Sequence, residues 1–232
     1  MKVELISYSN LGEKVCGIAS KTCVSENIPN VDDDVTKSLK SAMSSGHSAV
    51  LEHWTATFSI EGVSRVLTHQ LVRHRLASFS QQSQRYVKVT GKNNELGLNY
   101  ITPYSIWDIG LDYEYDELMD SIESFYDKMI ARGIPEEDAR YILPNACTTN
   151  IVVSMNAREL RHFFKYRVCN RAQWEIRELA KQMLTLCKEV APTIFANAGA
   201  NCDVLGYCPE ARSCGKCPRF TDLKEKGSVD GQ

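Results

Sequence analysis

The chain has 232 residues, 43% of them hydrophobic, and a formal net charge of −2 at pH 7. That apolar fraction is typical of a folded globular protein, and so small a charge creates no field that would draw the molecule to nucleic acid or an acidic membrane. No apolar run reaches the roughly 18 residues of a membrane span, and the N-terminal residues lack the apolar core of a signal peptide. We therefore expect a cytoplasmic protein without membrane or nucleic-acid partners.

The first half of the chain alternates between strand and helix patterns. Apolar and polar residues alternate over 2–7 and 53–60, which predicts two strands. Helical spacing predicts one helix over 35–45, ended by Gly46, and another over 63–74.

The second half is mainly helical. An apolar stripe predicts an amphipathic helix over 115–132, and β-branched residues predict a strand over 148–155. Asn156 and Glu159 have the spacing of a capping box that would open a helix ending near residue 167. Further helices are predicted over 136–142 and 172–190. Because the strands and helices follow no regular β-α-β rhythm, an α+β fold is favoured. We expect one domain over residues 1–200 and a Cys-rich tail over 201–232.

One stretch has an unusual composition for a protein core. Residues 73–86 read Arg-His-Arg-Leu-Ala-Ser-Phe-Ser-Gln-Gln-Ser-Gln-Arg-Tyr. Adjacent cations repel unless an anion joins them, and the planar arginine fork is suited to phosphate or carboxylate. His74, between two arginines, would have its charged form disfavoured. The residues alone thus predict an anion site but no particular reaction, because the chain has neither a dinucleotide-binding nor a phosphate-loop motif.

The order of several blocks resembles one known family. Arg73-His74-Arg75, followed after seven residues by Ser83, is similar to the signature of flavin-dependent thymidylate synthases. The flanking residues 69–72 and 84–86 also match, as do blocks at 46–53, 156–167 and 172–176. The resemblance covers roughly residues 1–200.

The resemblance implies an enzyme with a central, mainly antiparallel sheet flanked by helices. Such an enzyme methylates dUMP to dTMP with 5,10-methylenetetrahydrofolate, and FAD reduced by NADPH supplies the hydride. It uses no cysteine nucleophile, and as a homotetramer it shares its active sites between subunits.

The resemblance also implies roles for individual residues. Arg167 would be catalytic, facing the uracil and favouring loss of its N3 proton. The implied dUMP contacts are Gln70, Leu71, Val72, Arg73, Gln81, Gln82, Ser83, Gln84, Arg85, Arg140 and Arg167. The implied FAD contacts are His47, Arg73, His74, Arg75, Gln81, Asn156, Arg158 and His162. No metal takes part in the implied reaction.

Two positions depart from the pattern of some family members. Ala49 stands where some carry a hydroxyl residue that touches FAD, so that bond must be absent or come from Ser48. Gln81 stands where some have glutamate. Glutamine keeps an acceptor oxygen but lacks the negative charge.

Nine cysteines are present, an odd number with no secretion signal, so we expect thiols or metal ligands and no disulfide framework. Four lie near the C-terminus in the order Cys202-x5-Cys208-x5-Cys214-x2-Cys217. Two interpretations stay open for them: a four-thiolate zinc site, or a thiol-rich tail without metal.

Two alternative functions also stay open. The first is a nucleic-acid-binding module that uses residues 73–85 and the tail, although acids balance the bases and few aromatic residues lie nearby. The second is a flavoprotein that binds nucleotide but has lost catalysis, for which Gln81 is the one supporting feature.

Overall fold

The structure is a computed structural model that describes residues 1–87 and 98–225. Residues 226–232 of the expected tail therefore lie outside the described part. None of the helices in the described ranges combines the length and hydrophobicity that a membrane span requires.

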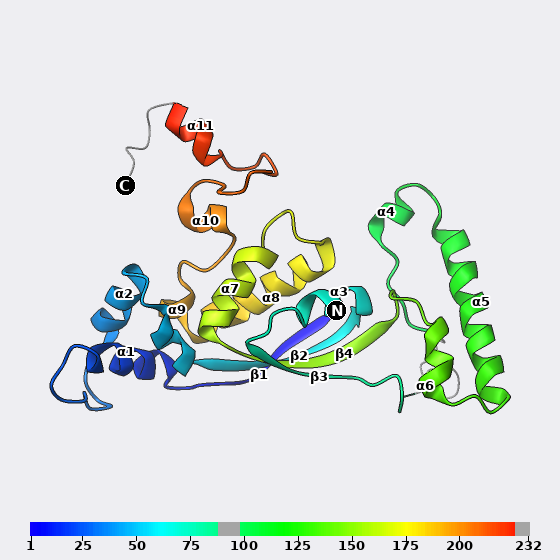
Figure 1. Cartoon of the computed structure of the whole chain (residues 1–232), viewed down its shortest axis with the longest axis horizontal. Helices are drawn as coiled ribbons and strands as arrows, with labels where there is room; N and C mark the ends of the chain where they lie inside the picture. Colours follow the sequence, from blue (N-terminus) through cyan, green and yellow to red (C-terminus); the bar gives the residue numbers. More distant parts are fainter. Residues whose placement is uncertain (88–97, 226–232) are drawn as a thin grey trace. The chain divides into compact units, whose positions relative to one another are not determined.

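Within the described residues, four strands form one sheet in the order β1-β2-β4-β3 (Figure 1). Their bounds are β1 (Lys2–Tyr8), β2 (Thr55–Ser64), β3 (Ala77–Gln81) and β4 (Thr148–Asn156). The central pairing of β2 with β4 is antiparallel, as the register of two contacts shows: the Gly62 N–H donates to Asn150 Oδ1 at 3.1 Å, and the Thr57 and Ser154 hydroxyls lie 2.8 Å apart. Helices flank the sheet, so the predicted α+β class is confirmed.

By their contacts the residues divide into two compact units, here called unit 1 and unit 2. Unit 1 comprises Met1–Lys2, Ser59–Arg73 and Phe79–Val152, and unit 2 comprises Val3–Phe58, His74–Ser78 and the described residues from Val153 on. All but one of the boundaries fall inside strands, and the exception, between Arg73 and His74, lies between β2 and β3. The expected division at residue 200 stays a prediction.

Unit 1 contains α3 (Arg65–Leu71), α4 (Tyr104–Trp107), α5 (Asp112–Ala131), α6 (Glu136–Ala139) and the 3-10 turn η3 (Arg140–Ile142). The helix predicted over 63–74 is shorter at both ends. Ser64 still belongs to β2, and its hydroxyl accepts the Leu67 N–H at 3.0 Å, so Ser64 is the N-cap of α3.

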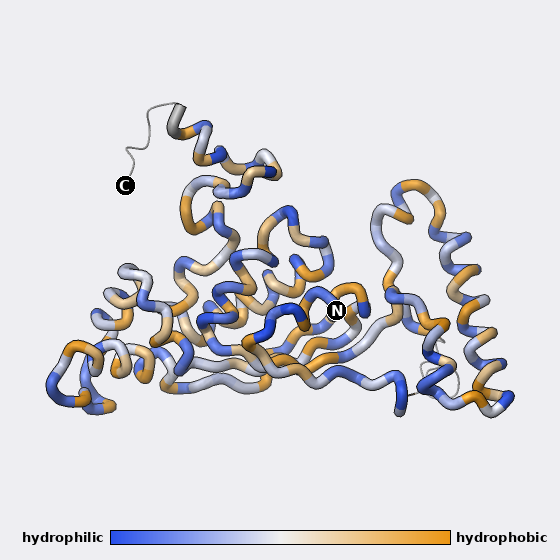
Figure 2. The backbone as a smooth tube through the Cα atoms, viewed as in Figure 1, coloured by the Kyte–Doolittle hydropathy of each residue, from blue (hydrophilic) through white to orange (hydrophobic). Residues whose placement is uncertain are grey.

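The apolar stripe predicted for 115–132 is only partly buried. Met119 and Tyr126 on α5 are buried, whereas Leu118 and Phe125 are 56% and 49% exposed. Figure 2 shows the hydrophobic positions that recur along this helix. Helical periodicity therefore predicted the helix correctly, but the described residues do not cover the whole of its apolar face.

Unit 2 contains the remaining helices: α1 (Gly12–Thr22), α2 (Thr36–Ser44), the 3-10 turn η1 (Ser48–His53), α7 (Ala157–Arg167), α8 (Trp174–Val190), α9 (Pro192–Phe195), α10 (Asn201–Leu205) and α11 (Phe220–Glu225). Figure 1 shows α7 and α8 side by side, as their mutual contacts also indicate. The strand predicted from His53 begins at Thr55, because residues 48–53 form η1 instead.

An aromatic cluster forms the core of unit 2. The rings of Trp54 and Phe195 meet edge to face with centroids 5.3 Å apart, and those of Phe164 and Phe195 are 6.0 Å apart. All three side chains are fully buried. Gly12 begins α1 against this cluster, since a Cβ there would lie only 2.0 Å from Trp54 Cδ1. This core fixes the neighbouring helix α7, which carries much of the candidate site.

Candidate functional site

Helix α7 begins where the sequence predicts, but with half of the predicted capping box. The Asn156 side chain accepts the Glu159 N–H at 2.9 Å and so caps the helix. The Glu159 carboxylate does not complete the box. It turns toward His74, which lies in the segment before β3.

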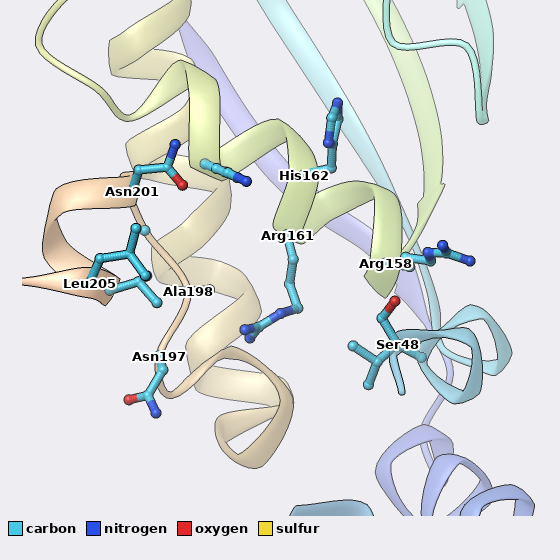
Figure 3. A pocket seen from close by; sticks show the side chains of 12 residues that line it. Ser48, Arg158, Arg161, His162, Asn197, Ala198, Asn201 and Leu205 are labelled. Carbon is cyan, nitrogen blue, oxygen red and sulfur yellow. The ribbon is translucent and has the colours of Figure 1, made fainter. Parts of the chain in front are cut away.

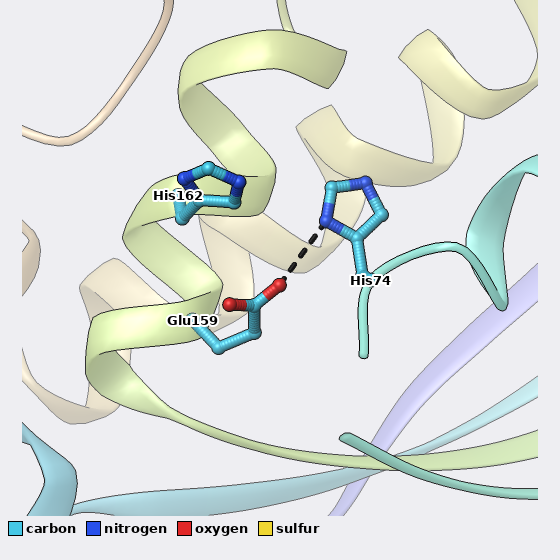
Figure 4. Close-up of side chains that lie close together, drawn as sticks. All are labelled: His74, Glu159 and His162. Carbon is cyan, nitrogen blue, oxygen red and sulfur yellow. Dashed lines mark hydrogen bonds and ion pairs between the residues drawn. The ribbon is translucent and has the colours of Figure 1, made fainter. Parts of the chain in front are cut away.

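Three side chains of unit 2, called here the His74 cluster, form a hydrogen-bonded chain: Glu159, His74 and Arg167. His74 Nδ1 lies 3.2 Å from Glu159 Oε1, and Arg167 Nε donates to His74 Nε2 at 3.1 Å. Figure 4 shows the hydrogen bond between His74 and Glu159, whose side chains are only 7% and 8% exposed. Because arginine can only donate, Nε2 must accept, and the imidazole proton therefore lies on Nδ1, where it is donated to the carboxylate.

The environment of His74 favours its neutral form. Burial lowers the pKa of His74, and the Arg167 cation lowers it further, while the hydrogen bond and charge of Glu159 act in the opposite direction. The expectation of a neutral imidazole was based on the adjacent arginines in sequence. In the structure the main cause is burial, and the effective cation is Arg167.

His162 also lies close to this cluster. Among the residues that the structure describes, His74, Glu159 and His162 bring three ligand atoms within 4.8 Å of one another. Both ring nitrogens of His74 are already engaged, and the Arg167 cation lies against one of them. A metal ion bound to His74 would replace these hydrogen bonds and would lie beside the Arg167 cation. These residues therefore suit a bound anion better than a metal ion.

A cavity of about 430 Å³ lies beside α7 in unit 2 (Figure 3). Its lining includes the predicted flavin contacts Arg158 and His162, together with Ser48. Arg158 is also paired with Glu52 at 2.5 Å. Ser48, the hydroxyl residue next to Ala49, thus lines the same cavity as these two residues, and its contact with FAD stays a prediction.

Four polar lining residues were not predicted from the sequence: Arg161, Lys165, Asn197 and Asn201. The Arg161 guanidinium donates to the Ile194 carbonyl, and burial lowers its pKa. Residues 158, 161, 162 and 165 share one face of a helix through their i, i+3 and i+4 spacing. That spacing was a usable signal, and it brings three cationic residues to one cavity.

The other predicted flavin contacts differ in their surroundings. His47 is exposed immediately before η1, and Arg75 is exposed in the segment before β3. The Asn156 side-chain oxygen caps α7, as described above.

In unit 1, backbone and side-chain bonds hold the end of β3. Gln81 Nε2 donates to the hydroxyls of Thr68 and Thr149, at 3.1 and 3.4 Å. The Gln82 N–H donates to the Asn150 carbonyl at 2.9 Å, and the Gln82 carbonyl accepts from Arg65 Nη2 at 2.8 Å. Gln81 therefore acts here as a donor, a role that glutamate could not fill when ionised.

Three residues of unit 1 lie close together and are called here the Arg85 cluster: Arg85, Glu137 and Arg140. Arg85 Nη2 lies 2.9 Å from Glu137 Oε2, and Arg140 Nε donates to the Glu137 carbonyl at 3.0 Å. The paired side chains of Arg85 and Glu137 are 50% and 51% exposed. The structure thus brings the two predicted phosphate-binding arginines to one residue. Nearby, Ser83 Oγ accepts the Arg85 N–H at 3.2 Å.

The predicted dUMP contacts at the end of α3 are not equally accessible. Leu71 is fully buried, so only its backbone can reach a ligand, whereas Val72 is 40% exposed. Arg73 is exposed, and Gln70 and Gln84 are half-buried. Except for Arg167, all the predicted dUMP contacts belong to unit 1, and except for Arg73 and Gln81, all the predicted FAD contacts belong to unit 2.

Comparisons with known proteins agree with these observations. A family model described as thymidylate synthase complementing protein matches residues 4–193. A flavin-dependent thymidylate synthase of Geobacter sulfurreducens is 44% identical over 237 aligned positions, covering 99% of this chain and 100% of that protein. One from Pyrococcus horikoshii is 52% identical over 183 positions, covering 77% of this chain and 74% of the relative.

Among solved structures, a flavin-dependent thymidylate synthase from Helicobacter pylori, complexed with FAD and dUMP, has the same fold. The TM-score is 0.66 at 24% identity, over 86% of this chain and 100% of the other. With the family match over most of the residues and relatives more than 40% identical, this chain belongs to the flavin-dependent thymidylate synthase family.

Proposed function

We propose that this chain is an FAD-dependent thymidylate synthase that makes dTMP from dUMP, with 5,10-methylenetetrahydrofolate as carbon donor and NADPH as reductant. The observation that carries the proposal is the His74 cluster. Arg167 is bound through Nε to a neutral, buried imidazole. Within the described residues that bond is the only one its guanidinium makes, so both Nη groups are left for a ligand.

A guanidinium in this position suits activation of a uracil ring. Burial lowers the pKa of Arg167, but an arginine titrates so far above neutral pH that the group stays protonated. A cation beside the ring lowers the pKa of the uracil N3–H by stabilising the anion. Loss of that proton places electron density on C5, the atom that receives the one-carbon unit.

The Arg85 cluster suits the nucleotide phosphate. Two arginines meet at Glu137, whose carboxylate already occupies the fork of Arg85. A phosphate dianion offers more acceptor oxygens and more charge than this carboxylate. Exchange of one anion for the other would bring dUMP between Arg85 and Arg140.

The cavity beside α7 fits part of FAD. Arg158, Arg161 and Lys165 supply cationic charge for its pyrophosphate, and Ser48 and Asn197 supply neutral hydrogen-bonding groups. FAD, when bound, supplies the hydride of the reaction. The contribution of this chain is to bind and orient the cofactor through these side chains.

The cysteines support a reaction without a thiolate nucleophile. Burial raises the pKa of Cys16 to about 12 and that of Cys147 to about 11. Burial also raises the pKa of Cys187. These groups are thiols at neutral pH, and the thiol is a poor nucleophile.

Exposed apolar residues on α4 and α5 support the homotetramer. Trp107, Leu118 and Phe125 are 54%, 56% and 49% exposed, and apolar groups gathered on a surface are typical of subunit interfaces. Leu118→Glu with Phe125→Glu should yield smaller species in light scattering, whereas Ser124→Glu, on another face of α5, should not. A tetramer that survives the double substitution would contradict this part of the proposal.

The whole proposal is tested with purified protein and C5-tritiated dUMP. We expect a bound-flavin spectrum, bleaching by NADPH, and tritium release with dTMP formation only when the folate donor is present. A flavin spectrum without tritium release would instead indicate a flavoprotein that has lost catalysis. Steeply salt-dependent oligonucleotide binding, undisturbed by dUMP and without any flavin, would indicate the nucleic-acid module. The cytoplasmic location stays a prediction.

A further inference from the structure

A second cavity of unit 2 is lined by cysteines that the proposed reaction does not use. It has a volume of about 330 Å³, and Cys169, Cys202 and Cys208 line it. Cys169 follows α7, Cys202 belongs to α10, and Cys208 lies in the loop after it. Three thiols from separate segments therefore face one space.

Backbone bonds bring a fourth cysteine, Cys217, to the same place. The Cys208 N–H donates to the Pro218 carbonyl at 2.8 Å, and Cys208 forms a β-bridge with Arg219. The loop between Cys208 and Cys217 is thus closed with a thiol at each end. The side chains of Cys202 and Cys217 lie within hydrogen-bonding reach of each other, and Cys169 is also close enough to interact with Cys202.

The remaining C-terminal cysteine, Cys214, is arranged differently. Its side chain is exposed, whereas Cys169, Cys202, Cys208 and Cys217 are all half-buried. The Arg171 guanidinium donates to the Arg212 carbonyl, which ties the loop to the segment that carries Cys169. Sequence spacing selected Cys214 as a ligand candidate, while the tertiary structure offers Cys169 in its place.

We propose that Cys169, Cys202, Cys208 and Cys217 bind one Zn²⁺ ion as a structural four-thiolate site. Four sulfur ligands in a tetrahedron are the arrangement that structural zinc prefers. The complex of four thiolates and Zn²⁺ carries two negative charges, and Lys165 and Arg171, which line the same cavity, offset them.

The C-terminal segment from α10 to α11 has few other contacts that would stabilise it. Its helices α10 and α11 have 5 and 6 residues, and its aromatic contact is the Tyr207–Phe220 pair at 5.0 Å. Small segments with so little apolar core commonly rely on metals or disulfides. Within the described residues, no three of the sulfurs lie within 4.8 Å of one another. Zn–S bonds of about 2.3 Å require closer approach, so coordination would tighten the loop onto α10.

This tightening reaches the proposed flavin cavity. Asn201, Val204 and Leu205 of α10 line the cavity beside α7, and Asn201 and Cys202 line the cysteine cavity. A zinc ion that anchors α10 would therefore fix one wall of the flavin cavity. This link to FAD depends on the proposed function, but metal binding itself does not.

The test uses the full chain, purified under reducing conditions with ZnCl₂ and without chelator. We expect about one zinc per chain by elemental analysis, and thiolate-to-metal absorption when Co²⁺ replaces it. Cys169→Ser and Cys208→Ser should each lower the metal affinity at least tenfold. Cys214→Ser should retain the metal, and Cys23→Ser, which changes an exposed thiol immediately after α1, is the matched control.

Three results would overturn the proposal. They are less than a tenth of an equivalent of zinc, a disulfide between Cys202 and Cys217 in mass spectra, and loss of metal in Cys214→Ser but not in Cys169→Ser. To exclude misfolding, circular dichroism of each serine variant must match that of the parent, and Co²⁺ spectra must report on the site itself. Failure of flavin binding with intact zinc would count against the proposed function alone.

Discussion

The His74 cluster and the Arg85 cluster contain similar groups in opposite surroundings. In the first, the side chains of His74 and Glu159 are 7% and 8% exposed, whereas Arg85 and Glu137 in the second are 50% and 51% exposed. A buried polar chain keeps one geometry, because breaking any bond leaves an unsatisfied group. An exposed ion pair contributes little and exchanges readily. The first arrangement suits chemistry at a fixed position, and the second suits the capture of an anion.

The largest effect is expected from Arg167→Ala, which removes the cation from the buried cluster. Turnover should fall about 10²- to 10³-fold, the usual consequence of losing one group that stabilises developing negative charge. FAD affinity, measured by spectral titration, should change little. Arg177→Ala is the matched control, since that guanidinium donates to the Asn170 carbonyl outside the cluster. Methylation of dUMP near the parent rate would refute the role of Arg167.

A smaller effect is expected from Glu159, which acts through His74. Glu159→Ala removes the acceptor that places the proton on Nδ1, and a proton on Nε2 would oppose the Arg167 N–H. We expect kcat to fall about tenfold, equivalent to about 1.4 kcal/mol. Glu159→Gln keeps an acceptor oxygen and should remain within about twofold of the parent. Equal losses in both variants would show that the carboxylate charge matters, and not the tautomer.

Substitutions in the Arg85 cluster should change KM for dUMP and leave kcat nearly unchanged. Arg85→Ala removes a charge-assisted bond to phosphate worth about 1.5–3 kcal/mol, so KM for dUMP should rise at least tenfold. Glu137→Gln removes the competing carboxylate and should lower KM up to about fivefold, the limit set by a surface pair of about 1 kcal/mol. A large fall in kcat in either variant would show that the Arg85 cluster also acts on the chemical step and not on nucleotide binding alone.

The smallest effect concerns pH. Because the pKa of His74 is lowered in the folded protein, the unfolded chain binds its proton first as the pH falls below about 6.5. The free energy of unfolding should therefore decrease from that pH down to the folded pKa of His74, with no such contribution at higher pH. Protonation of His74 in the folded protein also abolishes the acceptor for Arg167, so kcat should fall at lower pH, as the pH passes through the folded pKa of His74.

Glu159→Gln provides the control for this pH dependence. Glu159 raises the pKa of His74, so removing its charge should shift the acidic limb of kcat to lower pH. A limb that does not move, or that moves to higher pH, would show that another group titrates.

Local patterns predicted much of the fold, and their failures have physical causes. The alternation in β2 was correct because one face packs in the core, where Trp54, Ala56 and Phe58 are fully buried. The helix over 63–74 was predicted too long, because periodicity does not reveal that Ser64 ends a strand and caps α3. The stripe on α5 was correct as a helix signal but did not predict burial, which depends on what packs against it.

The same distinction applies to the candidate sites. By itself, the sequence determined the family, the strand and helix types, and the arginine-rich stretch, because these depend on residue order and spacing. Three contacts became visible only in three dimensions: Glu159 bonds to His74, Arg161 and Lys165 line the cavity beside α7, and Cys169 lines the cysteine cavity. Glu159 and His74 lie 85 positions apart in the chain, and Cys169 and Cys208 belong to separate segments that line one cavity. Packing of such distant segments leaves no trace in local spacing.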